Sequence, residues 1–334
     1  MKLSDREMSA FLMYRMIRPE TTNTIGDYFP NRIPIRTSAE LENHLKKRIL
    51  EVKEQKIAIA LSGGIDSAIL ASFMPKGSIA YTFKCVVPGL QVIDETPVAA
   101  KYAEVCGLEH RIVEVYWEDF QKYSDQLMAQ KGAPIHSIEV QIYKAALQAK
   151  KDGIDAMIFG EAADAVYGGQ SNILSREWRV GEFVERFSYI MPYRILKNPE
   201  LPIDIVKQWE KNGFVDPFEF MSHVYIQESV GSYLNAVKLA GLDVLLPYAE
   251  TFLDCNIDYT RIRSGDNKYM VREVFQRVYP DFPVPPKTPM PRPMNEWLIN
   301  WTGPKRNEFW PNCVEGLTGD QKWLVWALER FLDN

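Results

Sequence analysis

The sequence lacks the features that mark several classes of protein. It contains four cysteines, Cys85, Cys106, Cys255 and Cys313. The closest two, Cys85 and Cys106, are 21 positions apart, so there is no CxxC pair for zinc or dithiol chemistry. We therefore expect four reduced cysteines with structural roles.

Long apolar runs and a basic surface stripe are also missing. No stretch approaches the roughly 20 consecutive apolar residues of a membrane span, and no basic-then-apolar leader opens the chain, so we expect a cytoplasmic protein without a membrane partner. The 39 Lys and Arg residues are dispersed and outnumbered by 44 Asp and Glu, for a net charge of −5. This balance does not indicate nucleic-acid binding.

What is present is a globular composition, with 46% apolar and 25% charged residues in a chain of 334. A helix is predicted from Ser38, a candidate N-cap, because Leu41, Leu45, Ile49 and Val52 share one helical face. The first 36 residues have no clear period and are predicted to be a lead-in segment.

Strands and helices then alternate along the chain. We predict strands at 57–61, 78–86, 111–115 and 155–159 and helices at 67–74, 96–106, 117–130 and 137–151. Such alternation is typical of an α/β fold, here a five-stranded parallel sheet with helices on both faces. Residues 37–170 would form this core, and 171–334 a mostly helical second lobe.

A glycine loop follows the first of these strands, in "IAIALSGGIDSAIL" (57–70). In a parallel sheet, loops at the carboxyl ends of strands hold ligands. Gly63 and Gly64 allow a ligand to approach backbone N–H groups, and Ser62 and Ser67 add hydroxyl donors, so the loop suits an anion. No lysine follows in the Walker A position, so this is not that phosphate loop.

Asp66 is the unusual member of the loop, because a carboxylate repels phosphate unless a cation lies between them. Magnesium is the expected cation, since it combines one or two carboxylates with phosphate oxygens. The plainer alternative is an exposed Ser-Gly turn with Asp66 as a helix cap.

A second loop, "IFGEAADAVYGGQ" (158–170), follows another predicted strand and supplies Gly160, Glu161 and Asp164. Two strand-end loops meet at one edge of a parallel sheet, so Asp66 and Asp164 are predicted to share the metal. Taken alone, Glu161 and Asp164 would be an N-capping pair.

Four stretches in the same order resemble one family. "SGGIDS" is similar to the pyrophosphate loop of N-type ATP pyrophosphatases, and "FGEAADAVYGGQ" resembles a loop of the asparagine synthetase synthetase domain. "LAGLDVLLPYAETFLD" (239–254) and "DNKYMVREVFQRVYPDFPVPPK" (266–287) resemble two later segments of that domain. The resemblance covers about 38–300 and implies an adenine nucleotide α-hydrolase-like fold.

The resemblance also implies a reaction and a set of roles. ATP would adenylate a carboxylate with release of pyrophosphate, and ammonia or an amine would take the acyl group to give an amide and AMP. The positions that match the family motifs are Ser62, Gly63, Gly64 and Ser67 for pyrophosphate, Asp66 and Asp164 for Mg²⁺, Lys287 for the reacting phosphate and carbonyl, and Glu161 for proton transfer at the amine. We add Gly160 and Lys268 as nucleotide contacts, with Leu61 and Phe83 as neighbours of the adenine.

Departures from the family pattern affect the substrate and the nitrogen source. Leu245 stands where the family usually has arginine, and alanines surround Asp164, so aspartate is in doubt as the substrate. Lys2 follows Met1, where related synthetases expose a glutaminase cysteine, and the start resembles the linker that normally follows that domain. Nitrogen would then come from free ammonia, a separate glutaminase chain or an amine on the substrate.

Two alternatives remain open from the sequence. One is a tRNA-modifying thiolase or ligase with the same loop, which needs a reactive cysteine and a basic surface. The other is a nucleotide-binding subunit that has lost turnover. Lys287 could also be a solvated loop lysine, and Lys268 and Arg272, four apart, could lie on a solvated helix face.

Overall fold

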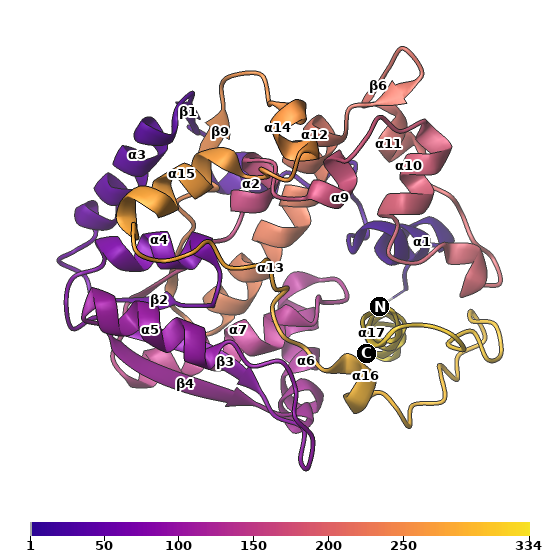
Figure 1. The fold of residues 1–334 in the computed structure, drawn as a ribbon. Helices are drawn as coiled ribbons and strands as arrows, with labels where there is room; N and C mark the ends of the chain where they lie inside the picture. Colours follow the sequence, from indigo (N-terminus) through magenta and orange to yellow (C-terminus); the bar gives the residue numbers. More distant parts are fainter. Residues whose placement is uncertain (1) are drawn as a thin grey trace.

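The protein, described here as a computed structural model over residues 2–334, is built on a five-stranded parallel sheet (Figure 1). Its strands are β2 (Ile57–Ala60), β3 (Ile79–Cys85), β4 (Glu109–Val115), β5 (Ala156–Ile158) and β8 (Asp243–Leu245). They lie in the order β4-β3-β2-β5-β8, and every neighbouring pair is parallel. The predicted fold class is confirmed.

Two layers of helices cover the sheet (Figure 1). One layer consists of α3 (Ser38–Glu51), α4 (Ile65–Phe73), α5 (Thr96–Cys106) and α15 (Tyr269–Val278). The other consists of α6 (Trp117–Lys131), α7 (Ile138–Lys151) and α13 (Ile226–Leu239). Burial on both faces explains why β2 reads as a continuous apolar run instead of an alternating one.

Helix α3 shows how local sequence sets an element's start. Its predicted apolar face is correct, since Leu41, Leu45 and Ile49 are fully buried. The predicted N-cap is wrong by one residue: Thr37 has the extended conformation of a cap, and its hydroxyl accepts from the N–H of Glu40. The Glu40 side chain in turn accepts from the N–H of Thr37. A capping box needs its acid three residues after the cap, and this spacing selects Thr37 over Ser38.

The remaining elements surround this core. Near the N-terminus lie α1 (Asp5–Tyr14), α2 (Thr24–Tyr28) and β1 (Ile33–Ile35), and β1 pairs in parallel with β9 (Thr251–Leu253). The middle of the chain adds α8 (Ala163–Val166), α9 (Ser171–Leu174), α10 (Val180–Phe187), η1 (Pro192–Arg194), α11 (Asp204–Lys207), β6 (Glu210–Lys211), β7 (Phe214–Val215), α12 (Pro217–Phe220) and the π-helical turn η2 (Met221–Tyr225). The last elements are α14 (Tyr259–Arg263), α16 (Met294–Trp297) and α17 (Gly319–Asp333).

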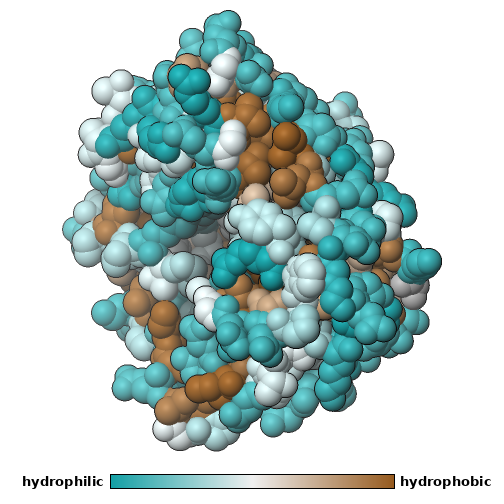
Figure 2. All heavy atoms as spheres, turned by 90° about the vertical axis from the view of Figure 1, so that its right-hand side faces the viewer, coloured by the Kyte–Doolittle hydropathy of each residue, from teal (hydrophilic) through white to brown (hydrophobic). Residues whose placement is uncertain are grey.

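Helices α1 and α17 pack together, and both chain ends lie on this side of the molecule (Figure 1). The face seen from this side carries its hydrophobic residues in separate groups among hydrophilic ones (Figure 2). Scattered exposed apolar side chains are normal for a globular protein. None of the helices within residues 2–334 combines the length and apolar character needed to cross a bilayer.

The fifth strand comes from an unexpected part of the chain. Strand β8 lies in the stretch predicted as the helical lobe, and it pairs with β5 through Ile158 and Leu245. The larger of two buried clusters extends from Leu3 to Leu332, and a smaller one joins residues of 10–16 with residues of 173–224. The sheet is therefore shared between the two predicted parts, and a division at residue 170 stays a proposal.

Candidate active site at the carboxyl edge of the sheet

The site lies where the strand order reverses. From β2 the chain runs outward to β3 and β4, and it then returns to add β5 and β8 on the other side. The loops after β2 and β5 diverge at this point and leave a crevice at the carboxyl edge of the sheet. Gly160 lets them approach, because a Cβ on it would lie 2.8 Å from the backbone N of Ser67.

A cavity of about 230 Å³ opens at this crevice. The predicted site residues that line it are Leu61, Ser62, Asp66, Ser67, Phe83, Gly160, Glu161, Asp164 and Lys287. Gly63 and Gly64 lie in the same loop as Ser62, and Lys268 does not line the cavity but contacts Asp66 and Asp164, which do. The structure therefore brings the predicted set together, while the role of each residue remains a prediction.

The glycine loop is ordered by its own hydroxyls. The Ser62 and Ser67 hydroxyl oxygens are 2.9 Å apart, and the N–H of Gly64 donates to the Ser62 hydroxyl at 3.2 Å. Helix α4 begins after Gly64 and has no side-chain cap, so Asp66 is not the capping residue of the alternative interpretation. The loop instead directs the amino end of α4, which favours anions, toward the cavity.

Lys268 joins the two aspartates. Its ammonium lies 2.6 and 2.5 Å from the carboxylate oxygens of Asp66 and 2.9 Å from Oδ1 of Asp164. The side chain is only 9% exposed, so the alternative of a solvated helix face is wrong for this lysine. Arg272 points elsewhere and donates to the carbonyl and side-chain oxygens of Asn267, at 2.7 Å each.

Lys287 approaches from the other side. Its ammonium is 2.7 Å from Oδ2 of Asp164 and 3.2 Å from the carbonyl oxygen of Gly169. With 47% of its side chain exposed and a proline-rich loop around it, this lysine can leave Asp164 more easily than the buried Lys268 can.

The ammonium groups of Lys268 and Lys287 strongly affect the pKa of the carboxylate between them. Burial alone would raise the pKa of Asp164, but the ammonium groups of Lys268 and Lys287 hold that pKa well below its usual range. Burial disfavours the charged form of Lys268, yet the carboxylates of Asp164 and Asp66 raise its pKa above the ordinary value. Asp66 differs from Asp164, because burial raises its pKa even though the ammonium of Lys268 favours its charged form.

Glu161 lines the cavity next to Ser229 and Tyr233. Burial raises the pKa of Glu161, while the backbone of Ala162 and the hydroxyls of Ser229 and Tyr233 favour its charged form. Ala162 has a left-handed backbone, with φ of 74°, which is costly for a residue with a Cβ. Since α8 starts with no side-chain cap, Glu161 and Asp164 are not an N-capping pair.

The comparison with known families agrees with this geometry. The profile of the asparagine synthase family matches residues 37–233, which is more than half of the chain and includes both loops. The chain belongs to this family. Asparagine synthase domains are PP-loop domains of ATP-using ligases, and the predicted relationship is confirmed.

Solved structures similar to this family member are more distant. An NH3-dependent NAD synthetase from Campylobacter jejuni is 17% identical, with a TM-score of 0.27 over 40% of this chain and 61% of that one. An NMN synthetase from Francisella tularensis is 15% identical, with a TM-score of 0.27 over 75% and 97% of the two chains. A U34-tRNA thiolase from Methanococcus maripaludis is 16% identical, with a TM-score of 0.28 over 75% and 82%. No curated protein matches the sequence.

The carboxylates of this asparagine synthase domain fit a magnesium ion in their chemistry. Asp66 and Asp164 lie in the first turns of α4 and α8, and Oδ1 of Asp164 is buried without a well-aligned hydrogen bond. Within residues 2–334 no group of three or more Asp, Glu, His or Cys side chains could form an all-protein cage. Magnesium commonly uses one or two carboxylates with phosphates and water, so two suffice. Lys268 contacts the same two carboxylates and would compete with the ion.

The sequence analysis did not predict three of the residues that line the cavity. Glu95 lines the cavity at the start of α5, and burial, with the charge of Asp94, raises its pKa to about 7 although the Gly63 N–H favours the charged form. Tyr225 and Tyr233 also line the cavity, near Glu161. Tyr225 is the last residue of the π-helical turn η2, and such turns often occur at functional sites.

The structure also places two other residues that the sequence analysis discusses. Cys85 is buried, and its thiol donates to the carbonyl oxygen of Pro291, which agrees with a structural role. Leu245 lines a separate hollow with Arg48 and Glu250 and is not among the residues that line the cavity at the crevice. What the missing arginine means for the substrate stays a prediction.

Proposed function

We propose that the protein uses ATP to adenylate a carboxylate, with release of pyrophosphate, and then transfers the acyl group to ammonia or an amine. The observation that carries this proposal is the convergence of Asp66, Asp164, Lys268 and Lys287 beside a glycine loop at the switch point of the sheet. Backbone N–H groups and lysines at such a crevice suit a triphosphate whose α–β bond is broken.

In the first step the substrate carboxylate attacks the α-phosphorus, and the pyrophosphate leaves with the electron pair of the broken P–O bond. Ser62, Gly63, Gly64 and Ser67 would donate to the pyrophosphate, and Asp66 and Asp164 would hold Mg²⁺. Mg²⁺ would supply charge neutralisation of the leaving group. Lys287 would stabilise the charge that develops on the α-phosphate.

In the second step an amine attacks the acyl carbon, and AMP leaves. The attacking nitrogen must lose a proton, and Glu161 is the carboxylate on this side of the cavity. Its raised pKa, caused by burial, brings its proton affinity closer to neutrality, which is the property of an efficient general base. Ammonia, a partner glutaminase or an amine on the substrate would each satisfy this chemistry.

The test is product identity. With ATP, Mg²⁺ and a panel of carboxylates we expect equal amounts of AMP and pyrophosphate, measured by chromatography and a coupled pyrophosphate assay. ADP and phosphate instead would contradict the adenylation mechanism. Pyrophosphate release only in the presence of tRNA would favour the thiolase alternative, and nucleotide binding without turnover would favour the inactive subunit.

A second prediction concerns Glu95. Since its pKa is about 7, raising the pH from 6 to 8 places a carboxylate next to the anion loop, and we expect ATP binding to weaken. Glu95→Gln should bind ATP about 3- to 10-fold more tightly than the natural protein at pH 8, which corresponds to about 0.7–1.4 kcal/mol, and equally well at pH 6. Calorimetric titration at both pH values measures this.

The phosphate groups of ATP titrate near the same pH as Glu95, but their titration affects the natural protein and the Glu95→Gln variant equally. The difference in ATP affinity between the two proteins therefore reports Glu95 alone. The charge that acts on Glu95 is that of Asp94, which is itself paired with Lys84 at 3.0 Å. An identical change in ATP affinity with pH for both proteins would show that Glu95 does not face the phosphates.

A further inference from the structure

One group of the residues that line the cavity has a distinct, largely apolar and aromatic chemistry. The part of the cavity that we call the acyl chamber is lined by Phe159, Glu161, Tyr225, Tyr233, Met290 and Pro291. Phe159 and Tyr233 pack edge to face, with ring centroids 5.0 Å apart. Tyr225 and Tyr233 lie eight positions apart, two turns along one face of η2 and α13, so both rings are placed by rigid elements.

The acyl chamber has no free cation. Among the described residues that line the whole cavity there is no arginine or histidine, and Lys287 is the single lysine. Lys287 is paired with Asp164 and is the residue assigned to the reacting phosphate and carbonyl. No positive side chain is left over for a second carboxylate on the substrate.

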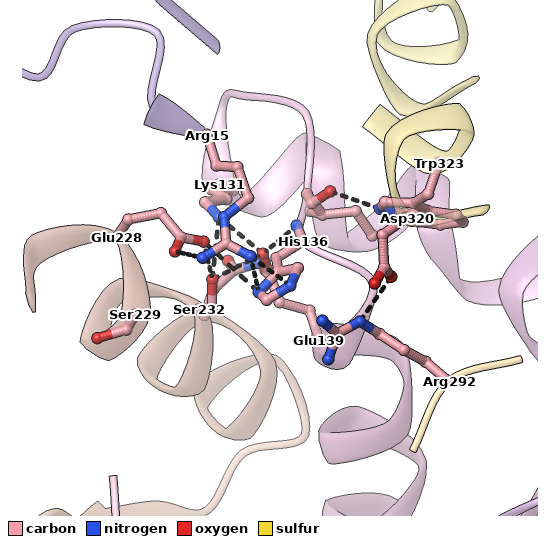
Figure 3. A network of polar contacts seen from close by, with 12 residues as sticks. Arg15, Lys131, His136, Glu139, Glu228, Ser229, Ser232, Arg292, Asp320 and Trp323 are labelled. Carbon is pink, nitrogen blue, oxygen red and sulfur yellow. Dashed lines mark hydrogen bonds and ion pairs between the residues drawn. The ribbon is translucent and has the colours of Figure 1, made fainter. Parts of the chain in front are cut away.

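Arg15 and Arg292, whose charges act on Tyr225 and Tyr233, are already paired with carboxylates (Figure 3). Arg15 contacts a carboxylate oxygen of Glu228 at 2.7 Å and Nε2 of His136 at 2.6 Å. Arg292, which directly follows Pro291, pairs with Asp320 at 2.7 Å. Freeing either arginine for a substrate would leave its partner carboxylate unpaired.

The rest of this network has no spare charge either. Glu139, which is fully buried, is satisfied by Lys131 at 2.7 Å and by Ser232 at 3.2 Å. Burial and the positive charge of Arg15 lower the pKa of His136 well below its usual value, so the ring is neutral. The network is a balanced set of ion pairs behind the acyl chamber and not a receptor for an anion.

From these contacts we infer that the acyl substrate is a carboxylate on an apolar, ring-bearing body rather than an amino dicarboxylate. This inference rests on the proposed function and names its substrate class. A second carboxylate in the acyl chamber would lose its hydration without gaining a partner, which costs several kcal/mol. An aromatic ring there would gain about 25 cal/mol per Å² of buried apolar surface.

The experiment compares two substrates that differ at one end. 3-Phenylpropanoate and succinate share a propanoate chain, with a phenyl group in one where the other has a carboxylate. ATP–pyrophosphate exchange needs no amine, so it reports carboxylate activation alone. We expect kcat/KM for exchange to be at least about tenfold higher with 3-phenylpropanoate than with succinate or aspartate, equivalent to about 1.4 kcal/mol.

Two variants locate the effect. Tyr225→Leu should raise the KM for 3-phenylpropanoate severalfold and leave the KM for ATP unchanged, because this ring lies at the acyl end. Tyr193→Leu is the matched control: Tyr193 is 54% exposed and does not line the cavity, so no constant should change. Circular dichroism and ATP affinity verify that both variants fold.

The outcomes separate this inference from the proposed function. Faster exchange with succinate or aspartate than with 3-phenylpropanoate would overturn the substrate class and leave the adenylation intact. A preserved KM for 3-phenylpropanoate in Tyr225→Leu would overturn the acyl chamber as the place where the ring binds. The absence of exchange with every carboxylate would overturn the proposed function and the inference with it.

Discussion

Replacing Lys268 with methionine is expected to lower the free energy of unfolding by about 3–5 kcal/mol. The ammonium of Lys268 lies between two partly buried carboxylates, and its loss leaves Asp66 and Asp164 facing each other with only the half-exposed Lys287 to balance them. Methionine has a similar length and the same Cβ, so the cost of the left-handed backbone at this position, φ of 52°, is unchanged. Urea unfolding followed by circular dichroism measures the effect.

The same variant should become dependent on magnesium for its stability. Without the ammonium, the two carboxylates form a free oxygen site, and Mg²⁺ at about ten times its Kd would restore about 1.4 kcal/mol. In the natural protein, Lys268 competes for these oxygens, so Mg²⁺ alone should change the melting temperature much less. The readout is the difference in melting temperature between Mg²⁺ and EDTA, measured without nucleotide.

Two comparisons test whether the ammonium of Lys268 is responsible for these effects. Lys84→Met removes a lysine of the surface, whose pair with Asp94 is 37% and 29% exposed, and it should cost no more than about 1 kcal/mol with no response to Mg²⁺. A Lys268→Met variant as stable as the natural protein would show that the aspartates do not depend on this ammonium. Equal Mg²⁺ responses in the variant and the natural protein would argue against Asp66 and Asp164 as metal ligands.

Lys268 also shows where prediction from sequence reaches its limit. The strands and the two loops are predictable because runs of apolar residues, and the glycines that interrupt them, are local features of the sequence. The contact between Lys268 and Asp66 joins residues 202 positions apart and depends on a left-handed turn just before α15. Sequence alone predicted a metal ion at this position and could not predict that the chain supplies a cation of its own.

Short and mixed signals account for the other missed features. Strand β8 has three residues, Asp243–Leu245, which are too few to show a period of two. Tyr225 and Tyr233 have the spacing of an ordinary buried helix face, and only the packing of α13 against the second loop turns them toward Glu161. Glu95 lies at the start of α5, where a carboxylate usually interacts favourably with the helix dipole. This ordinary role gave no reason to predict that Glu95 lines the cavity.

The largest effect on turnover is expected for Lys287→Met. If this lysine stabilises the charge that develops on the α-phosphate, its loss should lower kcat for pyrophosphate formation by about 10²–10³, or about 2.7–4 kcal/mol of transition-state energy. The KM for ATP should change little, because the glycine loop and the metal hold the nucleotide. Stability should change little as well, since Asp164 keeps its contact with Lys268.

Separating the two steps makes the Lys287 prediction specific. ATP–pyrophosphate exchange reports adenylation alone, whereas AMP release with an amine present reports both steps, so a fall in both rates assigns Lys287 to the first barrier. A fall only in AMP release would assign it to acyl transfer. Lys84→Met is again the control, because Lys84 neighbours the cavity without lining it and should leave both rates unchanged. Undiminished exchange and AMP release in Lys287→Met would remove this lysine from the mechanism, and the charge on the phosphate would have to be met by Lys268 instead.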